Sequence, residues 1–250
     1  MKLQTSALLA TLLLAACSST PVDHNPPSPG FDAGRSDARA IEIADQVMVA
    51  MGGRRAWDKT RCIQWNFADK RRHLWDKHTG DLRLDDGLRT VLMNLNSGQG
   101  RVFEAGEEIV RDTDKKRDML ERAYKLWVNG SYWLIAPYKM KDTGTRLTWR
   151  REEALPDGRM ADVVRLEFDG VGVTPENAYD LWVARDTHLV ERWAYFKWRG
   201  DSQPAMDNPW RDWRRYGSIL LASDHGTGPA TKDIKIYDQP PPRLFDPKLE

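Results

Sequence analysis

The sequence predicts a mainly β domain of the α+β class, in which one antiparallel sheet is accompanied by about two helices. Three observations support this class. Short alternating or apolar runs recur along most of the chain, and Gly, Asp, Asn or Pro separates nearly all of them. Only two segments show the three-and-four apolar spacing of a helix. With 250 residues the chain is long enough for one large β domain, and so many strands do not stay flat without curling.

The composition excludes several classes of protein. The 11 Trp, 7 Tyr and 6 Phe residues exceed what a disordered chain contains. The 38 basic and 37 acidic side chains give a formal net charge of +1, so no basic surface for nucleic acid is indicated. A mean hydropathy of -0.65 excludes a polytopic membrane protein. The two cysteines, Cys17 and Cys62, are too few for a disulfide framework or a multi-cysteine zinc site.

The N-terminus has the features of a bacterial secretory signal. Lys2 provides a positive start, and an apolar run follows from Leu8 to Ala16. This run is shorter than the roughly 20 residues that cross a bilayer. The sequence Leu14-Ala15-Ala16-Cys17 is similar to the lipobox of bacterial lipoproteins. We therefore expect residues 1–16 to be a signal peptide; the alternative is an ordinary secretory signal that happens to precede a cysteine.

The lipobox resemblance implies that Cys17 is the lipid attachment site, with a diacylglyceryl thioether and an N-acyl chain such as palmitate. Several acyl chains hold a protein on a membrane far more firmly than one chain. Ser18 replaces the Asp that usually retains Gram-negative lipoproteins in the inner membrane. The resemblance thus implies a location in the cell envelope, anchored to the outer membrane and facing the periplasm.

The mature chain divides into a tether and a single domain. Residues 17–37 are rich in Pro and Ser, which predicts an extended, solvated tether. Residues 38–250 form the predicted β domain. Its strands are expected at 63–67, 73–76, 82–85, 90–95, 163–168, 179–184, 189–198, 218–222 and 234–237.

The two predicted helices have capping signals. Ser36 or Asp37 precedes the first helix, which Gly52 and Gly53 end. The second begins at Asp112 or Thr113, places Met119 and Trp127 on one apolar face, and is expected to end at 129–130. The segment 132–135 that follows is predicted to be a buried strand.

No motif for catalysis is present. His73 and His78 with Asp76 and Asp81 suggest a metal cluster, but polar residues are expected at a strand end and turn in any case. The sequence has no Gly-x-Ser-x-Gly elbow to accompany His225 and no phosphate-binding glycine loop. We therefore expect no catalytic residue, metal or cofactor, and a protein that is not an enzyme.

The aromatic residues in the predicted strands and helices are the strongest functional signal. A curled sheet lined by such rings on its concave face would form an apolar cavity. The candidate ligand-binding residues are Trp65, Phe67, Trp75, Trp127, Trp133 and Trp182. Two other interpretations remain open: most of the rings fill the core and cross-strand pairs, or exposed rings stack on carbohydrate.

Several local motifs together resemble a known group of proteins. They are Met51-Gly52-Gly53, Ala56-Trp57-Asp58, Trp65-Asn66-Phe67, His73-x-Trp75-Asp76-Lys77, Thr79-Gly80-Asp81, the segment 132–139 and the hairpin 179–193. The group is a set of uncharacterised bacterial lipoproteins similar to the LolA/LolB-like periplasmic lipoprotein carriers and lipoprotein-sorting proteins, and the resemblance covers residues 38–247. It implies a half-open, curved antiparallel β-barrel, covering helices, and an apolar cavity for acyl chains.

The sequence thus predicts a membrane-anchored envelope lipoprotein that binds or carries lipid or lipoprotein acyl chains. Its expected partners are acyl chains and, through the N-terminal anchor, a membrane, without nucleic acid. One alternative is a structural envelope lipoprotein whose exposed sheet edge binds a partner protein. A hydrolase whose site carries none of the searched motifs is the third interpretation.

Overall fold

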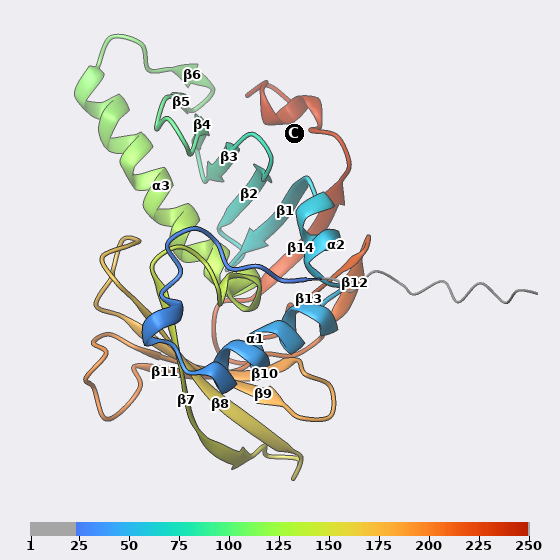
Figure 1. Ribbon diagram of the computed structural model, residues 1–250. Coiled ribbons are helices and arrows are strands. Elements are labelled where there is room, and N and C mark those ends of the chain that lie inside the picture. Colours follow the sequence, from blue (N-terminus) through green and yellow to red (C-terminus); the bar gives the residue numbers. More distant parts are fainter. Residues whose placement is uncertain (1–23, 250) are drawn as a thin grey trace, which may run out of the picture.

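The computed structural model describes residues 24–249, which fold into two antiparallel sheets, a two-stranded ribbon and three α-helices (Figure 1). The α-helices are α1 (Ala38–Ala50), α2 (Arg54–Lys59) and α3 (Thr113–Ile135), and the short 3-10 helices are η1 (Ala33–Arg35), η2 (Ala136–Lys139) and η3 (Pro242–Leu244). The strands are β1 (Cys62–Phe67), β2 (Arg71–Asp76), β3 (Asp81–Asp86), β4 (Arg89–Asn94), β5 (Gly100–Glu104), β6 (Glu107–Glu108), β7 (Thr145–Ala154), β8 (Met160–Phe168), β9 (Ala178–Ala184), β10 (Val190–Phe196), β11 (Met206–Pro209), β12 (Arg214–Tyr216), β13 (Ile219–Leu221) and β14 (Thr231–Tyr237).

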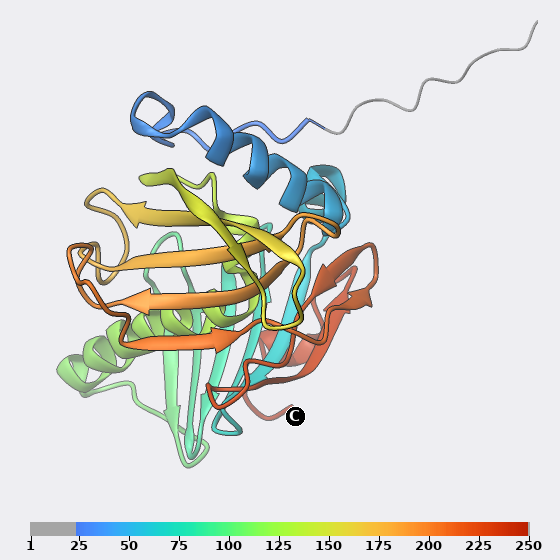
Figure 2. The ribbon, with the colours of Figure 1, turned by 90° about the horizontal axis from the view of Figure 1, so that it is seen from below.

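Most neighbouring strands are consecutive in the chain, and β14 returns to pair with β1. The larger sheet has seven strands in the order β14-β1-β2-β3-β4-β5-β6, and the smaller has five in the order β11-β10-β9-β8-β7. Figure 2 shows the strands of the two sheets crossing each other, and neither sheet closes on itself. The predicted class, a mainly β, half-open and curved antiparallel structure, is confirmed. The expectation of one continuous sheet is corrected, because the strands divide between two sheets and a ribbon.

The main core lies between the two sheets. The apolar face of α1, including Ile43 and Val47, packs there with inward side chains of both sheets. The helix ends as predicted, because Gly52 and Gly53 have positive φ values of 115° and 89°. A Cβ atom on Gly52 would lie 2.4 Å from the carbonyl oxygen of Ser218, so only glycine fits where these two backbone segments approach each other.

Helix α3 is longer than the sequence predicts. It begins where expected, since the Asp112 side chain accepts a hydrogen bond from the Lys115 amide at 2.9 Å. It does not end at Gly130, however, and the predicted strand 132–135 is its last turn. Gly130 is tolerated inside the helix because the His73 ring packs against it, only 3.1 Å from where a Cβ would be. The sequence predicts a helix end at Gly130, whereas in the structure this glycine lets the His73 ring pack closely against α3.

Several regions for which no element is predicted also form regular structure, among them α2, β11 and β12. The segment 145–154 forms β7, and 100–104 forms β5. Part of the predicted tether is attached to the domain: the amides of Ser28, Asp32 and Asp37 donate to the carbonyls of residues 141, 145 and 147. This part is therefore attached to the domain, although none of the residues 24–37 is buried. Residues 1–23, which include the predicted signal peptide and Cys17, lie outside the described residues.

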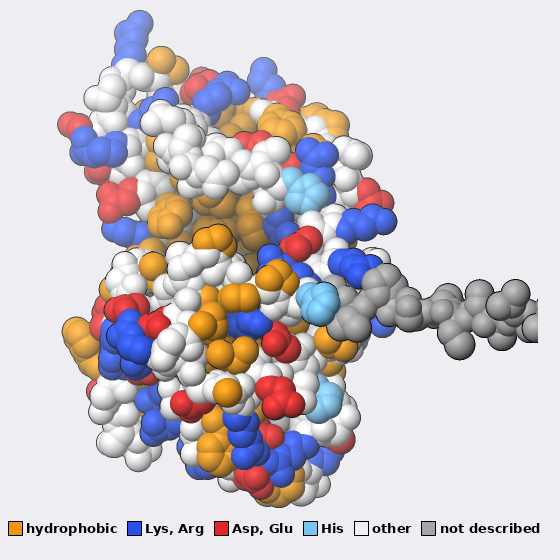
Figure 3. Space-filling view, in the orientation of Figure 1, with side chains coloured by type: hydrophobic (Ala, Val, Ile, Leu, Met, Phe, Trp, Pro, Cys, Tyr) orange, Lys and Arg blue, Asp and Glu red, His pale blue; other side chains and the backbone are white. Residues whose placement is uncertain are grey.

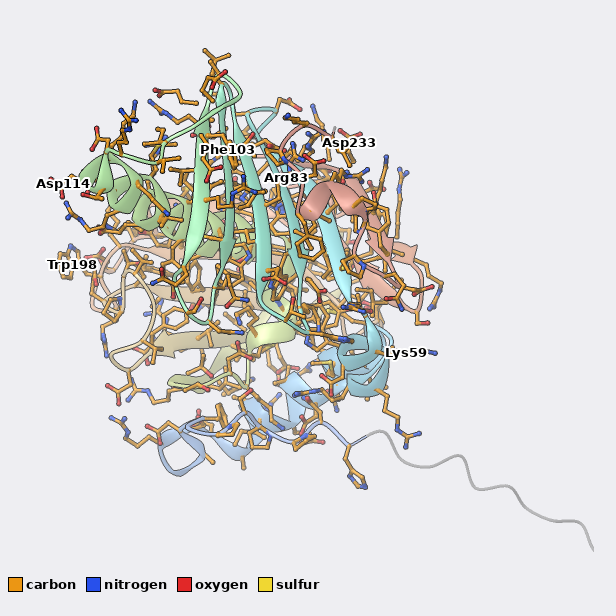
Figure 4. The ribbon with its side chains drawn as sticks, turned by 90° about the horizontal axis from the view of Figure 1, so that it is seen from above. Lys59, Arg83, Phe103, Asp114, Trp198 and Asp233 are labelled. Carbon is orange, nitrogen blue, oxygen red and sulfur yellow. The ribbon has the colours of Figure 1, made fainter. Side chains whose placement is uncertain are left out.

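The other face of the seven-stranded sheet is covered by the C-terminal segment. Arg83, labelled in Figure 4, is 4% exposed and donates to the backbone carbonyls of Arg243, Asp246 and Leu249. These bonds satisfy a buried guanidinium. They hold the C-terminal segment on the face of the sheet that carries Arg83. Helix α3 contacts β4 and β5 on the opposite face.

Candidate functional site: an aromatic cavity beside helix α3

A cavity of about 340 Å³ lies between the C-terminal half of α3 and the five-stranded sheet. Its walls come from α3, from the segment 139–145 before β7, and from the β8–β9 loop at 171–177. In Figure 3, hydrophobic side chains gather in a hollow near the middle of the molecule, between the part that carries α3 and the part that carries the smaller sheet. Its volume is at the small end of the range of about 300–1,000 Å³ typical of ligand pockets.

Four of the five aromatic rings in the lining form a cluster, and the fifth ring is that of Trp127. Tyr132 comes from α3, Phe168 ends β8, Tyr179 lies in β9 and Tyr195 in β10. The ring of Tyr179 is central, because its centroid lies 5.8 Å from those of Tyr132 and Phe168 and 5.4 Å from that of Tyr195. Such edge and offset contacts are favourable for aromatic rings. The wall is therefore a preformed cluster.

Polar and charged side chains complete the lining. Lys125 pairs with Glu121 one turn earlier in α3, and Lys139 pairs with Asp142. The lining itself contains two lysines and one aspartate. Around these lie hydroxyl and amide groups from residues 129, 131, 143, 145, 174 and 177. A pocket with an apolar body and a few polar groups suits a ligand with an apolar part and a polar part.

Burial raises the pKa of the two cavity tyrosines Tyr132 and Tyr179. Loss of water around the Tyr132 side chain raises the pKa of its hydroxyl well above the usual value, and Asp142 and Tyr179 raise it further. Burial likewise raises the pKa of Tyr179, with a smaller effect from Tyr195. Both hydroxyls therefore remain hydrogen-bond donors at every physiological pH.

The rim of the cavity is held in place by hydrogen bonds between two loops. Arg199, in the β10–β11 loop, donates its guanidinium to the carbonyls of Phe168 and Pro175 at 3.1 and 2.9 Å. Asn177 returns a bond to the carbonyl of Lys197 at 2.7 Å. On the same loop Trp198 is 62% exposed, and Figure 4 shows it at the edge of the molecule, pointing away from it.

Of the predicted ligand-binding residues, only Trp127 lines this cavity. Trp75 lies behind it, with its ring centroid 5.3 Å from that of Trp127 in an edge-to-face contact. The structure therefore places Trp127 in the cavity wall, and Trp75 contacts the cavity only through Trp127.

The other four predicted residues lie elsewhere. Trp65, Phe67 and Trp133 are at most 5% exposed in the main core. Trp182 points from the opposite face of the five-stranded sheet, where it packs in a separate cluster and the Arg192 guanidinium lies 4.2 Å from its ring centroid. None of these four lines the cavity.

Sequence reasoning missed the tyrosines and Phe168. A signal was present in β9, where Tyr179 alternates in phase with Leu181 and Val183 and out of phase with Trp182. Side chains two apart share a face of a strand, so Tyr179 and Trp182 had to lie on opposite faces. No comparable signal is present for Tyr132, because the sequence predicts a strand at 132–135 where the structure has the last turn of α3.

The suggested metal cluster is not assembled. His73 is fully buried with its ring stacked on Trp65, while the Asp76 carboxylate pairs with Arg61 and accepts from the backbone amide of His78. Within residues 24–249, no group of three His, Cys, Asp or Glu side chains is placed to hold a metal ion. In the same range, no helix is long and apolar enough to cross a membrane.

No family model and no curated protein matches the sequence. Among solved structures, the chain is similar to a DUF1329 family protein from Desulfovibrio piger, with a TM-score of 0.43 and 11% identity over 83% of this chain and 97% of that one. It is also similar to MucB, with a TM-score of 0.26 and 16% identity over 75% of this chain and 66% of that one. At these scores neither structure identifies a family for the chain.

Proposed function

We propose that this protein is an envelope lipoprotein that binds a single-chain apolar or amphipathic ligand in the cavity beside α3. The observation that carries the proposal is the preformed wall of Tyr132, Phe168 and Tyr179, which borders an unfilled volume in a domain whose core is otherwise packed with aromatic rings. Apolar clefts with a few polar groups are the usual binding sites of small amphiphiles.

The size of the cavity limits the size of the proposed ligand. A volume of about 340 Å³ suits one acyl chain or one compact amphiphile, and the several chains of a lipoprotein anchor would need more room. Burial of apolar surface contributes about 25 cal/mol per Å². Ordering the ligand offsets part of this gain, so we expect affinities in the micromolar range.

The membrane location rests on the N-terminal sequence. We propose that Cys17, at the end of Leu14-Ala15-Ala16-Cys17, carries the lipid and anchors the protein to the outer membrane. Intact-mass measurement should show a mature chain that starts at Cys17 with added acyl mass. An unmodified mature chain would contradict the anchor without affecting the cavity.

The binding experiment uses the unlipidated mature chain, residues 18–250, since every described helix and strand lies between 33 and 244. A fluorescent fatty acid is titrated into the wild type and into a Val128→Trp variant. Val128 lines the cavity from α3, and an indole there would fill it. We expect saturable binding by the wild type and loss of binding in the variant.

Two controls locate the binding. Val49→Trp places the same indole at a position on α1 that is 60% exposed, and Trp182→Phe alters a ring on the far face of the sheet. Both should bind as the wild type does, with unchanged far-UV circular dichroism. Binding by Val128→Trp equal to wild type, or no binding by the wild type at the ligand's solubility limit, would overturn the proposal.

A further inference from the structure

Two tyrosine hydroxyls in the cavity have no partner of their own. Among residues 24–249, no group forms a hydrogen bond with the hydroxyl of Tyr132 or of Tyr179. Both residues are half-buried, and their rings line the cavity. A tyrosine hydroxyl that faces a cavity and has no partner in the protein is available to bond a ligand or a water molecule.

A third tyrosine of the same core shows what a purely structural role looks like. The Tyr138 hydroxyl lies within hydrogen-bond distance of two backbone carbonyls, that of Met51 at 2.9 Å and that of Leu220 at 2.8 Å. Its ring also stacks on Trp57 at 4.2 Å between centroids. The protein thus satisfies the tyrosine that only joins elements together, and leaves unpartnered Tyr132 and Tyr179 of the three tyrosines that line the cavity.

The two unpartnered hydroxyls belong to neighbouring rings. Tyr132 and Tyr179 stack with 24° between their planes and 5.8 Å between their centroids, although one comes from α3 and the other from β9. Because both are neutral at physiological pH, each offers an O–H donor. An oxygen atom that accepts from either or both would complete the site.

The donors and charges of the lining indicate which acceptor fits. Lys139 pairs with Asp142 and Lys125 with Glu121, so the acidic side chain of the lining, Asp142, is already neutralised by a cation. Hydrogen bonds from neutral donors to an ionised acceptor are stronger than those between neutral groups. An anionic oxygen, such as that of a carboxylate or a phosphate, is therefore favoured over a neutral one.

We infer that the ligand is a single-chain amphiphile whose anionic oxygen head group accepts hydrogen bonds from Tyr132 and Tyr179. This inference rests on the proposed function and makes it more specific. The tyrosines select the head group, whereas Phe168 and the tyrosine rings contact the chain. A plain hydrocarbon of the same size would leave both hydroxyls unpaired and would gain nothing from them.

The test compares palmitate with diphenylhexatriene, a hydrocarbon fluorophore, on residues 18–250 and on the Tyr132→Phe/Tyr179→Phe double variant. The substitutions keep both rings and remove only the hydroxyls. We expect the double variant to bind diphenylhexatriene as the wild type does and palmitate at least about 10-fold more weakly. Tyr124→Phe, at an α3 position outside the cavity that is 39% exposed, should change neither affinity.

The outcomes separate the two proposals. Equal palmitate affinity in the wild type and the double variant would overturn the head-group inference and leave the cavity as an apolar site whose hydroxyls are hydrated. An equal loss of both ligands would also overturn it, because the hydroxyls would then shape the cavity and not select the head group. Failure of the wild type to bind either compound would overturn the proposed function itself. A lysophospholipid in place of palmitate distinguishes a phosphate from a carboxylate as the preferred head.

Discussion

Tyr132 and Trp133 are adjacent in α3, yet their rings enter two different kinds of surroundings. Trp133 is 5% exposed and packs edge-to-face on Trp193, which in turn packs on Trp210, 5.7 Å between centroids. Tyr132 joins the wall of the cavity beside Tyr179. The tryptophan cluster is closed on all sides, whereas the tyrosine cluster has an open side.

The difference shows that aromatic content alone does not identify a binding site. Trp193 and Trp210 lie inside the main core, at 2% and 0% exposure, and the indole nitrogen of each is buried without a hydrogen-bond partner in the described chain. Tyrosine places a polar group at the tip of the ring, and it suits a surface where a ligand or water meets that group. Under the proposed function, the tryptophan cluster contributes stability and the tyrosine cluster contributes the binding site.

The largest effect is expected from the closed cluster. Trp210→Ala removes a fully buried ring, and we expect the free energy of unfolding to fall by about 3–5 kcal/mol. Trp198→Ala, which removes an exposed ring, should change it by less than about 0.5 kcal/mol. Urea unfolding of both variants checks this, and a loss below about 1 kcal/mol for Trp210→Ala would show that the cluster is not closed.

A smaller effect is expected from acid, because two histidines lie within the tryptophan-rich core. Burial lowers the pKa of His73, stacked on Trp65, to about 3, and that of His225, beside Trp210, to about 4. The unfolded chain therefore binds protons at these sites first as the pH falls below about 6.5. Stability that is present at pH 7 should decline toward pH 5 by about 2 kcal/mol for each histidine.

Unfolding by urea at pH 7 and pH 5 measures this decline, and the variant His73→Phe/His225→Phe supplies the control. The phenylalanines keep a ring in each position and remove the titrating group. The double variant should lose clearly less stability between the two pH values than the wild type. Identical losses in the two proteins would show that the histidines are not the source.

The smallest effect is expected from the open cluster. Tyr179→Phe removes a hydroxyl that has no partner in the described chain, so the free energy of unfolding should stay within about 0.5 kcal/mol of the wild type. Thermal or urea unfolding tests this directly. A loss above about 1.5 kcal/mol would mean that the hydroxyl already has a structural role, and the contrast between the two clusters would fail.

The sequence was sufficient for most of the fold because its signals are local. The alternation in 63–67 and the glycines at 52 and 53 depend on neighbouring residues only, and both were interpreted correctly. The helix end at Gly130 was misjudged because the reason for that glycine is the ring of His73, which is distant in the sequence. The division into two sheets likewise depends on pairings between distant strands.

The candidate site was predictable only in part for the same reason. Trp127 was identified from its place on a helix, and it lines the cavity. Tyr132 and Tyr179 meet only because α3 crosses the end of the five-stranded sheet, and no local pattern reports that contact. The search for aromatic rings favoured tryptophans, which this chain uses mainly in its cores.

The most direct test of the account is a crystal structure of residues 18–250 grown with saturating palmitate. We predict density for one acyl chain between α3 and the five-stranded sheet, against Phe168, with the carboxylate within hydrogen-bond distance of the hydroxyl of Tyr132 or Tyr179. An empty cavity at saturation, or a chain bound among the core rings of Trp65 and Trp133, would contradict it.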